Sequence, residues 1–144
     1  GLVEMATLEL DGAGILAETT EPWQGLPSGT IMGHIHLHVA DLEAAKRFYT
    51  EGLLFNIVSY YPQAVFLSTG GYHHHIAINT WAGIDAPAPS ENSVGLAWYT
   101  IVYPNKEVRD KAVERLIQLG YEVIKNGSVY TTKDPSGNEI HLVL

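Results

Sequence analysis

The chain has 144 residues, of which 46% are hydrophobic and 17% are charged, and this is the size and composition of a single globular domain with a buried core. Sixteen acidic residues against eight scattered basic ones give a net charge of −8, which would repel a phosphate backbone, so nucleic acid is not an expected partner. Cysteine is absent, which excludes disulfides and thiolate metal ligands, and without an apolar run of about 18 residues or a secretory leader we expect a cytoplasmic protein with no membrane span.

The first thirty residues are expected to form a connecting arm. Residues 19–30 are rich in proline and glycine, which is typical of a linker. The chain begins at Gly1 without a methionine, so we expect a fragment, with residues 1–30 as a connecting arm and residues 31–144 as the domain proper.

The segment 31–82 is predicted to be a first β-α-β-β-β module. In residues 31–39 histidines alternate with aliphatic residues, which is the period of a half-buried strand. Asp41 is a suitable N-cap for a helix that ends at Gly52. Three further strands are predicted at residues 55–60, 64–68 and 73–80.

The segment 94–144 repeats this pattern after a proline-rich connector. Its predicted elements are a strand at 94–103, a helix from Asn105 to Gly120, hairpin strands at 121–125 and 128–132, and a last strand at 139–144. Asn126-Gly127 is the turn signal of that hairpin. The predicted fold class is α+β, with two βαβββ modules forming a curved mixed sheet, an open cup, and helices on its outer face.

Superposing the modules predicts which positions are equivalent. The matched pairs are Val39 with Val102, His34 with Ala97, His75 with His141, and His73 with Glu139. Strand alternation assigns six of the seven histidines, with Glu139 and Tyr99, to the face of the sheet away from the core. His74 and Trp98 are assigned to the core side.

This histidine-lined face predicts a single divalent metal, because neutral imidazole is the commonest protein ligand for divalent transition metals. Histidines two positions apart on a strand are about 6.5 Å apart, so one ligand from each of three strands is expected. We predict a mononuclear site of His34, His75 and His141, with Glu139 as a further candidate ligand. Strand histidines are also commonly solvent-facing or hydrogen-bonded without a metal, and that alternative stays open for each of them.

These segments resemble the vicinal oxygen chelate superfamily of glyoxalase I, bleomycin- and fosfomycin-resistance proteins and extradiol dioxygenases. The resemblance covers residues 31–144 and rests on the pattern that begins Gly33-His34-Ile35-His36 and on the turn Asp134-Pro135-Ser136-Gly137. More narrowly, residues 22–34, 70–75 and 79–81 are similar to the C-terminal half of bacterial catechol 2,3-dioxygenase-like proteins, which carry two such domains.

The resemblance implies metal ligands on the first and last strands of each module. His34 and His75 match such positions, and the final carboxylate of the family falls on His141, with Glu139 two residues earlier as a substitute. The second-module histidine falls on Ala97, which cannot bind a metal, and the tyrosine of extradiol enzymes falls on Thr131.

The function implied by the resemblance is a metal-binding domain like that of an extradiol ring-cleaving dioxygenase. It would act on an aromatic or other vicinal-oxygen small molecule together with a missing N-terminal domain or a second copy in a homodimer. His36 and Tyr99 are the catalytic or substrate-contacting candidates. Fe(II) is the implied metal, although three neutral histidines would also suit zinc or nickel. The competing interpretation is a non-catalytic half that is structural or binds a small ligand, and Ala97 and Thr131 favour it.

Overall fold

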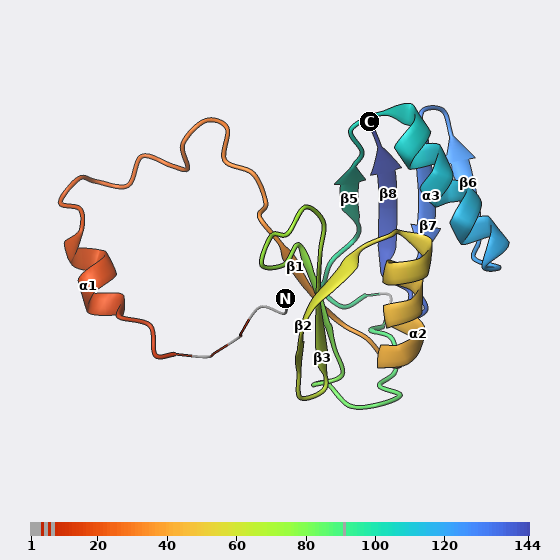
Figure 1. Cartoon of the computed structure of the whole chain (residues 1–144). Helices are drawn as coiled ribbons and strands as arrows, with labels where there is room; N and C mark the ends of the chain where they lie inside the picture. The colour runs from red at the N-terminus through yellow and green to blue at the C-terminus, as the bar shows by residue number, and fades with distance from the viewer. Residues whose placement is uncertain (1–3, 5, 7, 91) are drawn as a thin grey trace.

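The computed structural model describes residues 4, 6, 8–90 and 92–144, and it contains two four-stranded mixed sheets with their helices (Figure 1). The first sheet has the order β1 (Ile35–His38), β4 (Ile76–Asn79), β3 (Ala64–Ser68), β2 (Asn56–Tyr61). The second has the order β5 (Tyr99–Val102), β8 (Glu139–Val143), β7 (Val129–Lys133), β6 (Val123–Asn126). The helical elements are α1 (Gly12–Ala17), α2 (Leu42–Arg47), the π-helical turn η1 (Phe48–Gly52) and α3 (Lys106–Gln118).

Each sheet contains the four strands of one βαβββ module, and the helix of that module follows its first strand. The predicted repeat and the α+β class are therefore confirmed. In both modules the first strand pairs in parallel with the last, and the other neighbours are antiparallel. The strands form two separate sheets instead of one continuous sheet.

One hydrophobic core joins the two modules. Its buried residues come from α2, η1 and α3 and from alternate positions of the strands, as the period of two requires. Leu37 and Ile78 represent the first sheet in this core, and Ile140 and Leu142 represent the second. We call the face of each sheet that points away from this core its open face.

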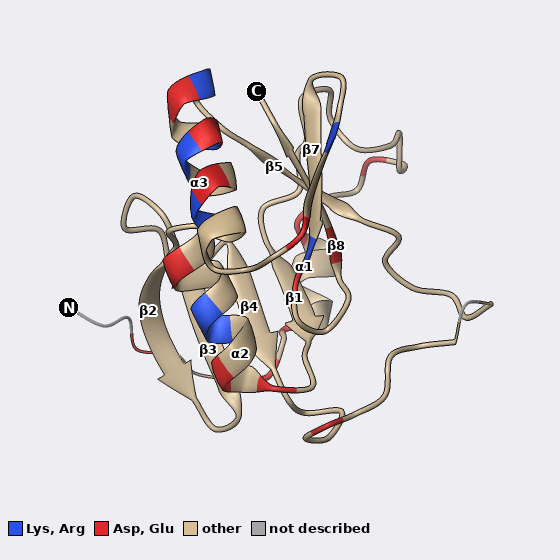
Figure 2. Cartoon of the chain, turned by 90° about the vertical axis from the view of Figure 1, so that its right-hand side faces the viewer, with Lys and Arg blue, Asp and Glu red and all other residues tan. Residues whose placement is uncertain are grey.

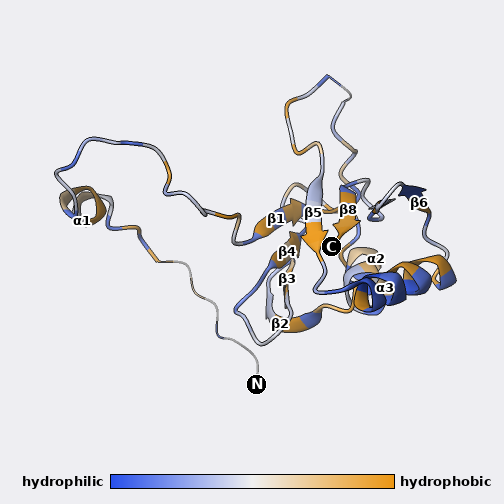
Figure 3. Ribbon diagram, turned by 90° about the horizontal axis from the view of Figure 1, so that it is seen from above, coloured by the Kyte–Doolittle hydropathy of each residue, from blue (hydrophilic) through white to orange (hydrophobic). Residues whose placement is uncertain are grey.

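From α1 to β1, the arm extends away from the sheets (Figures 1 and 3). It contains α1, which the sequence analysis did not predict, and Asp11 caps this helix by accepting from the backbone N–H of Gly14. No residue of α1 is buried. Within the described residues, no helix is both long and apolar enough to cross a membrane.

The register between the modules differs by one residue from the predicted match in the first strands. Val39 and Tyr103 are equivalent, because each is buried and donates its N–H to the last strand of its own sheet, Val39 to Asn79 and Tyr103 to Val143. The counterpart of His34 is therefore Trp98, not Ala97.

The last strands are also shifted against the predicted match. Ile35 pairs with Ile76, and its counterpart Tyr99 pairs with Ile140, so Ile76 is equivalent to Ile140. His75 therefore corresponds to Glu139, and the predicted equivalence of His75 with His141 is wrong.

This correction reverses two face assignments. Side chains alternate along a strand, so a slip of one residue moves each of them to the opposite face. Tyr99 packs on the core, whereas the side chain of Trp98 is 54% exposed. The predicted places of Tyr99 on the non-core face and of Trp98 in the core were thus exchanged.

Candidate metal centre

The pairing of β1 with β4 brings distant histidines together. His34 directly precedes β1, and His73 and His74 precede β4. Because the two strands are parallel, their amino ends lie at the same edge of the sheet. The N–H of Ile35 donates to the carbonyl of His75 at 2.9 Å, which fixes the two ends side by side.

His34, His73 and His74 form a cluster with the spacing of a metal site. One ring nitrogen of each lies within 4.8 Å of those of the other two. Nitrogens that share one ion at bonds of about 2.0–2.1 Å are roughly 3.3 Å apart, so modest ring rotations would bring the three into range. His34 and His73 are exposed, which leaves their rings room for such rotations.

His74 is the buried member of the cluster, with only 5% of its surface exposed. Burial, and then the neighbouring His34 and His73, lower the pKa of His74 to about 4, so its ring is neutral at pH 7. Its Nδ1 atom is buried and has no hydrogen-bond partner among the described residues. A neutral imidazole with a free buried nitrogen is what a metal ligand requires, and the residues present therefore fit a divalent cation.

His36 and Phe66 enclose the cluster on the open face of the first sheet. The Nε2 atoms of His36 and His74 are 3.1 Å apart, at hydrogen-bond distance. Burial, and then the nearby His34, lower the pKa of His36 as well. The ring of Phe66 makes edge contacts with the rings of His36 and His74, at 5.9 and 5.1 Å between centroids.

The structure does not bring the predicted trio His34, His75 and His141 together. His75 Nδ1 accepts from the backbone N–H of Thr69 at 3.2 Å and lies 3.2 Å from the hydroxyl oxygen of Ser68. These contacts tie the ring of His75 to the end of β3. Among the described residues, the one group of three potential ligands with metal-site spacing is His34, His73 and His74.

His141 lies in a different environment, on the open face of the second sheet. Its Nε2 is 3.0 Å from Glu139 Oε1, and its ring is stacked on Trp98 with centroids 5.3 Å apart and planes 12° apart. The candidate ligands His141 and Glu139 thus contact each other and are not part of the first-module cluster.

Tyr99 belongs to a buried chain of hydroxyl contacts. Its hydroxyl is 2.9 Å from that of Tyr49, which in turn donates to Asp134 Oδ2 at 2.9 Å. Burial raises the pKa of Tyr99 and of Tyr49 well above the ordinary value, so both stay protonated. This chain links η1, β5 and the turn before β8, and it keeps the hydroxyl of Tyr99 on the core side.

Sequence reasoning did not select His73 and His74 as ligands. It extended the last strand of the first module back to residue 73, and alternation then placed His74 in the core. The regular strand begins only at Ile76, so alternation does not govern residues 73–75, and His74 packs beside His36 on the open face. The topology of the module could have indicated these two ligands. In a βαβββ module the first and last strands are parallel neighbours, so the residues that precede these two strands lie close together.

The two βαβββ modules place the chain in a class of small α+β domains, and its histidine cluster could hold a metal. Residues 31–142 match the Glyoxalase/Bleomycin resistance protein/Dioxygenase superfamily, and the chain belongs to this family. This confirms the family resemblance seen in the sequence.

Particular relatives agree with this assignment. The catechol-2,3-dioxygenase of Bacillus subtilis (strain 168) is 45% identical over 144 residues, which cover 97% of this chain and 50% of that protein. The chain therefore spans about half the length of this relative. A lactoylglutathione lyase from Agrobacterium tumefaciens is 25% identical, with a TM-score of 0.57 over 81% of this chain and 94% of that one. A glyoxylase/bleomycin resistance protein/dioxygenase domain from Frankia sp. EAN1pec, at 20% identity, has a TM-score of 0.64 over 80% of this chain and 97% of its own, and it supports the fold.

Proposed function

We propose that this chain is the metal-binding part of a ring-cleaving dioxygenase of the catechol type, with one divalent metal held by His34, His73 and His74. The observation that carries the proposal is the three-imidazole cluster on the open face of a dioxygenase-family fold. The substrate would be a catechol or another small molecule with vicinal oxygens, as the name of the Bacillus relative suggests. Because the chain spans half of that relative, we propose that it acts with a further domain or a second copy.

The chain's own residues would hold and shelter the metal. Three neutral imidazoles add no negative charge, so the charge of a divalent ion stays uncompensated and favours an anionic ligand such as a catecholate. Phe66 borders the cluster on one side with an apolar ring. Iron, when bound, supplies the redox chemistry of ring cleavage; zinc or nickel in the same site would bind vicinal oxygens without it.

A second candidate function, a non-catalytic half that binds a small ligand, is favoured by one observation. Trp98 stands at the second-module counterpart of His34 and cannot bind a metal, so the second module contributes no ligand at that position. The face of the Trp98 ring that is not stacked on His141 would instead offer a flat surface for a planar ligand.

Metal analysis tests the metal site. The full chain would be purified without an affinity tag, stripped with a chelator and loaded anaerobically with Fe(II) or Zn(II). We expect about one metal per chain for the wild type and for the control His38→Ala, since His38 lies on the same strand outside the cluster. His34→Ala, His73→Ala and His74→Ala should each lower metal affinity at least ~10-fold. Less than about 0.2 metal per chain in the wild type would contradict the proposal.

Oxygen uptake separates the two candidate functions. With Fe(II) bound, addition of catechol should consume oxygen at a rate that His34→Ala abolishes and His38→Ala leaves unchanged. The assay would be run with this chain alone and with the complementary half of the Bacillus relative added. If the chain binds stoichiometric metal but consumes no oxygen in either case, the dioxygenase function is rejected and the ligand-binding function is favoured.

A further inference from the structure

We propose that His74 binds the metal through Nδ1, and that His36 is the positioning residue that holds the ring in this orientation by accepting a hydrogen bond from His74 Nε2–H. This inference rests on the proposed function, because it concerns the same cluster. It adds a residue that is not itself a ligand and names which nitrogen of His74 faces the metal.

The two nitrogens of His74 have different surroundings. Nε2 lies 3.1 Å from Nε2 of His36, a distance that requires a shared proton. Nδ1 is buried and has no hydrogen-bond partner among the described residues. A buried polar atom without a partner is uncommon in folded proteins and calls for an explanation such as an ion. A metal on Nδ1 would satisfy the nitrogen that the protein leaves free.

The protonation states then follow from one another. A histidine that binds a metal through Nδ1 carries its proton on Nε2, and that N–H needs an acceptor. The Nε2 lone pair of His36 is the acceptor within reach, so His36 must carry its own proton on Nδ1. Both rings are then neutral, and the contact between the two Nε2 atoms has one donor, His74, and one acceptor, His36.

The packing around the pair keeps this geometry. The rings of His36 and His74 are nearly perpendicular, at 82° with centroids 5.1 Å apart, and Phe66 contacts both. Since β1 carries His36 and the segment before β4 carries His74, the parallel pairing of the two strands sets their separation. His36 therefore acts from a rigid strand on a ligand in an irregular segment, which is the usual task of an outer hydrogen-bond partner at a metal site.

Nuclear magnetic resonance of the ¹⁵N-labelled full chain loaded with zinc tests the binding mode directly. Two-bond ¹H–¹⁵N spectra distinguish protonated, free and metal-bound ring nitrogens. We expect a metal-bound Nδ1 and a protonated Nε2 for His74, and a proton on Nδ1 of His36. A metal-bound Nε2 in His74 would overturn this inference and leave the proposed function standing. If zinc does not bind at all, both fail.

Substitutions of His36 give a second, independent readout. His36→Phe keeps a ring of similar size but removes the acceptor, and it should weaken Zn(II) and Co(II) binding by about 10- to 100-fold and shift the visible absorption bands of bound Co(II). His36→Gln places a carbonyl acceptor near the position of Nε2 and should recover most of the affinity. His38→Ala is the matched control on the same strand and face and should change neither quantity. Unchanged affinity and an unchanged Co(II) spectrum in His36→Phe would show that His36 does not position His74.

Discussion

Among the single residues of the cluster, His74 has the most unusual surroundings. The rings of His34, His36, His73 and Phe66 all lie within 5.1 Å of its ring, centroid to centroid. None of these neighbours carries a negative charge that would stabilise an imidazolium. Burial and the neighbouring histidines therefore keep the pKa of His74 low and its nitrogens available to a metal.

The low pKa of His74 predicts a loss of stability in acid. In the unfolded chain this histidine takes up a proton below its ordinary pKa of about 6.5, whereas the folded chain accepts it only near pH 4. The unfolded state thus binds more protons between these values, and the unfolding free energy should fall by roughly 1–2 kcal/mol from pH 7 to pH 5. Urea denaturation of the metal-free protein at both pH values measures the difference. His74→Gln should reduce it and His38→Gln should not; an equal pH dependence in His74→Gln would refute the assignment to this ring.

The hydroxyl of Tyr49 gives a second prediction at the scale of one atom. It donates to Asp134 and contacts the hydroxyl of Tyr99; Tyr49 and Asp134 are buried, and Tyr99 is partly buried. Tyr49→Phe keeps the ring but removes the hydroxyl, so Asp134 and Tyr99 each lose a hydrogen-bond partner. We therefore expect a loss of about 1–3 kcal/mol in unfolding free energy. The control is Tyr60→Phe, because Tyr60 is exposed. Equal stabilities of the two variants in urea would show that the buried chain contributes nothing.

At the scale of the elements, the sequence predicted the order and type of nearly every helix and strand, and it failed on register. Periods of two and of 3.6 residues identify elements because burial repeats with them. Matching Val39 with the chemically similar Val102 instead of Tyr103 shifted β5 by one residue, and this exchanged the faces of Trp98 and Tyr99. Chemical similarity does not fix register; the hydrogen bonds of the paired strands do.

Only part of the candidate site could be predicted from the sequence, because the rest depends on how the strands pair. The open face and His34 follow from alternation alone. The participation of His73 and His74 depends on where β4 begins and on which strand lies beside it, and both are set by pairing between segments far apart in the sequence. A period read along one segment does not contain that information.

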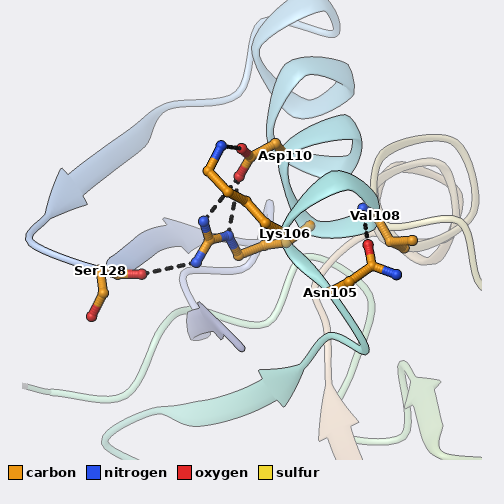
Figure 4. A network of polar contacts seen from close by, with 6 residues as sticks. Asn105, Lys106, Val108, Asp110 and Ser128 are labelled. Atoms are coloured by element: carbon orange, nitrogen blue, oxygen red, sulfur yellow. Dashed lines mark hydrogen bonds and ion pairs between the residues drawn. The ribbon is translucent and has the colours of Figure 1, made fainter.

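A buried arginine, Arg109, joins helix α3 to the second sheet, and this predicts a large effect of one substitution. Figure 4 shows Asp110 of α3 and Ser128 in the β6–β7 turn of the second sheet, which both contact it. Arg109 donates to the carbonyl of Ser128, in the turn between β6 and β7, and to Asp110, and it lies over the ring of Tyr130. Arg109→Met keeps much of the side-chain volume but removes these donors, so we expect the unfolding free energy to fall by about 1–3 kcal/mol.

The same helix supplies the control for this prediction. Its outer side carries charges of both signs (Figure 2), including the exposed pair Lys111–Glu107. Lys111→Ala should change stability by less than about 0.5 kcal/mol in the same urea experiment. A loss in Arg109→Met no larger than that in Lys111→Ala would show that the buried contacts are energetically neutral.

At the scale of the whole molecule, the two modules share a core but not a metal site. Buried residues of both sheets belong to one hydrophobic cluster. In addition, the backbone N–H of Ala40, two residues after β1, donates to the hydroxyl oxygen of Ser136 in the second module at 3.0 Å. All three proposed ligands, in contrast, lie in the first module. A metal bound there should therefore stabilise the second module only through the common core.

This arrangement predicts that zinc stabilises a region that it does not touch. At a free concentration of about 100 times its dissociation constant, zinc should raise the unfolding free energy by about 2.7 kcal/mol, provided that it does not bind the unfolded chain. In a Trp23→Phe/Trp81→Phe protein, Trp98 fluorescence reports on the second module and far-ultraviolet circular dichroism reports on both. Because the core is shared, we expect zinc to move both thermal midpoints upward together, and to move neither in the same protein with His34→Ala. If zinc raises the thermal midpoint measured by circular dichroism but not the midpoint measured by Trp98 fluorescence, the two modules unfold independently. The common core would then not couple them.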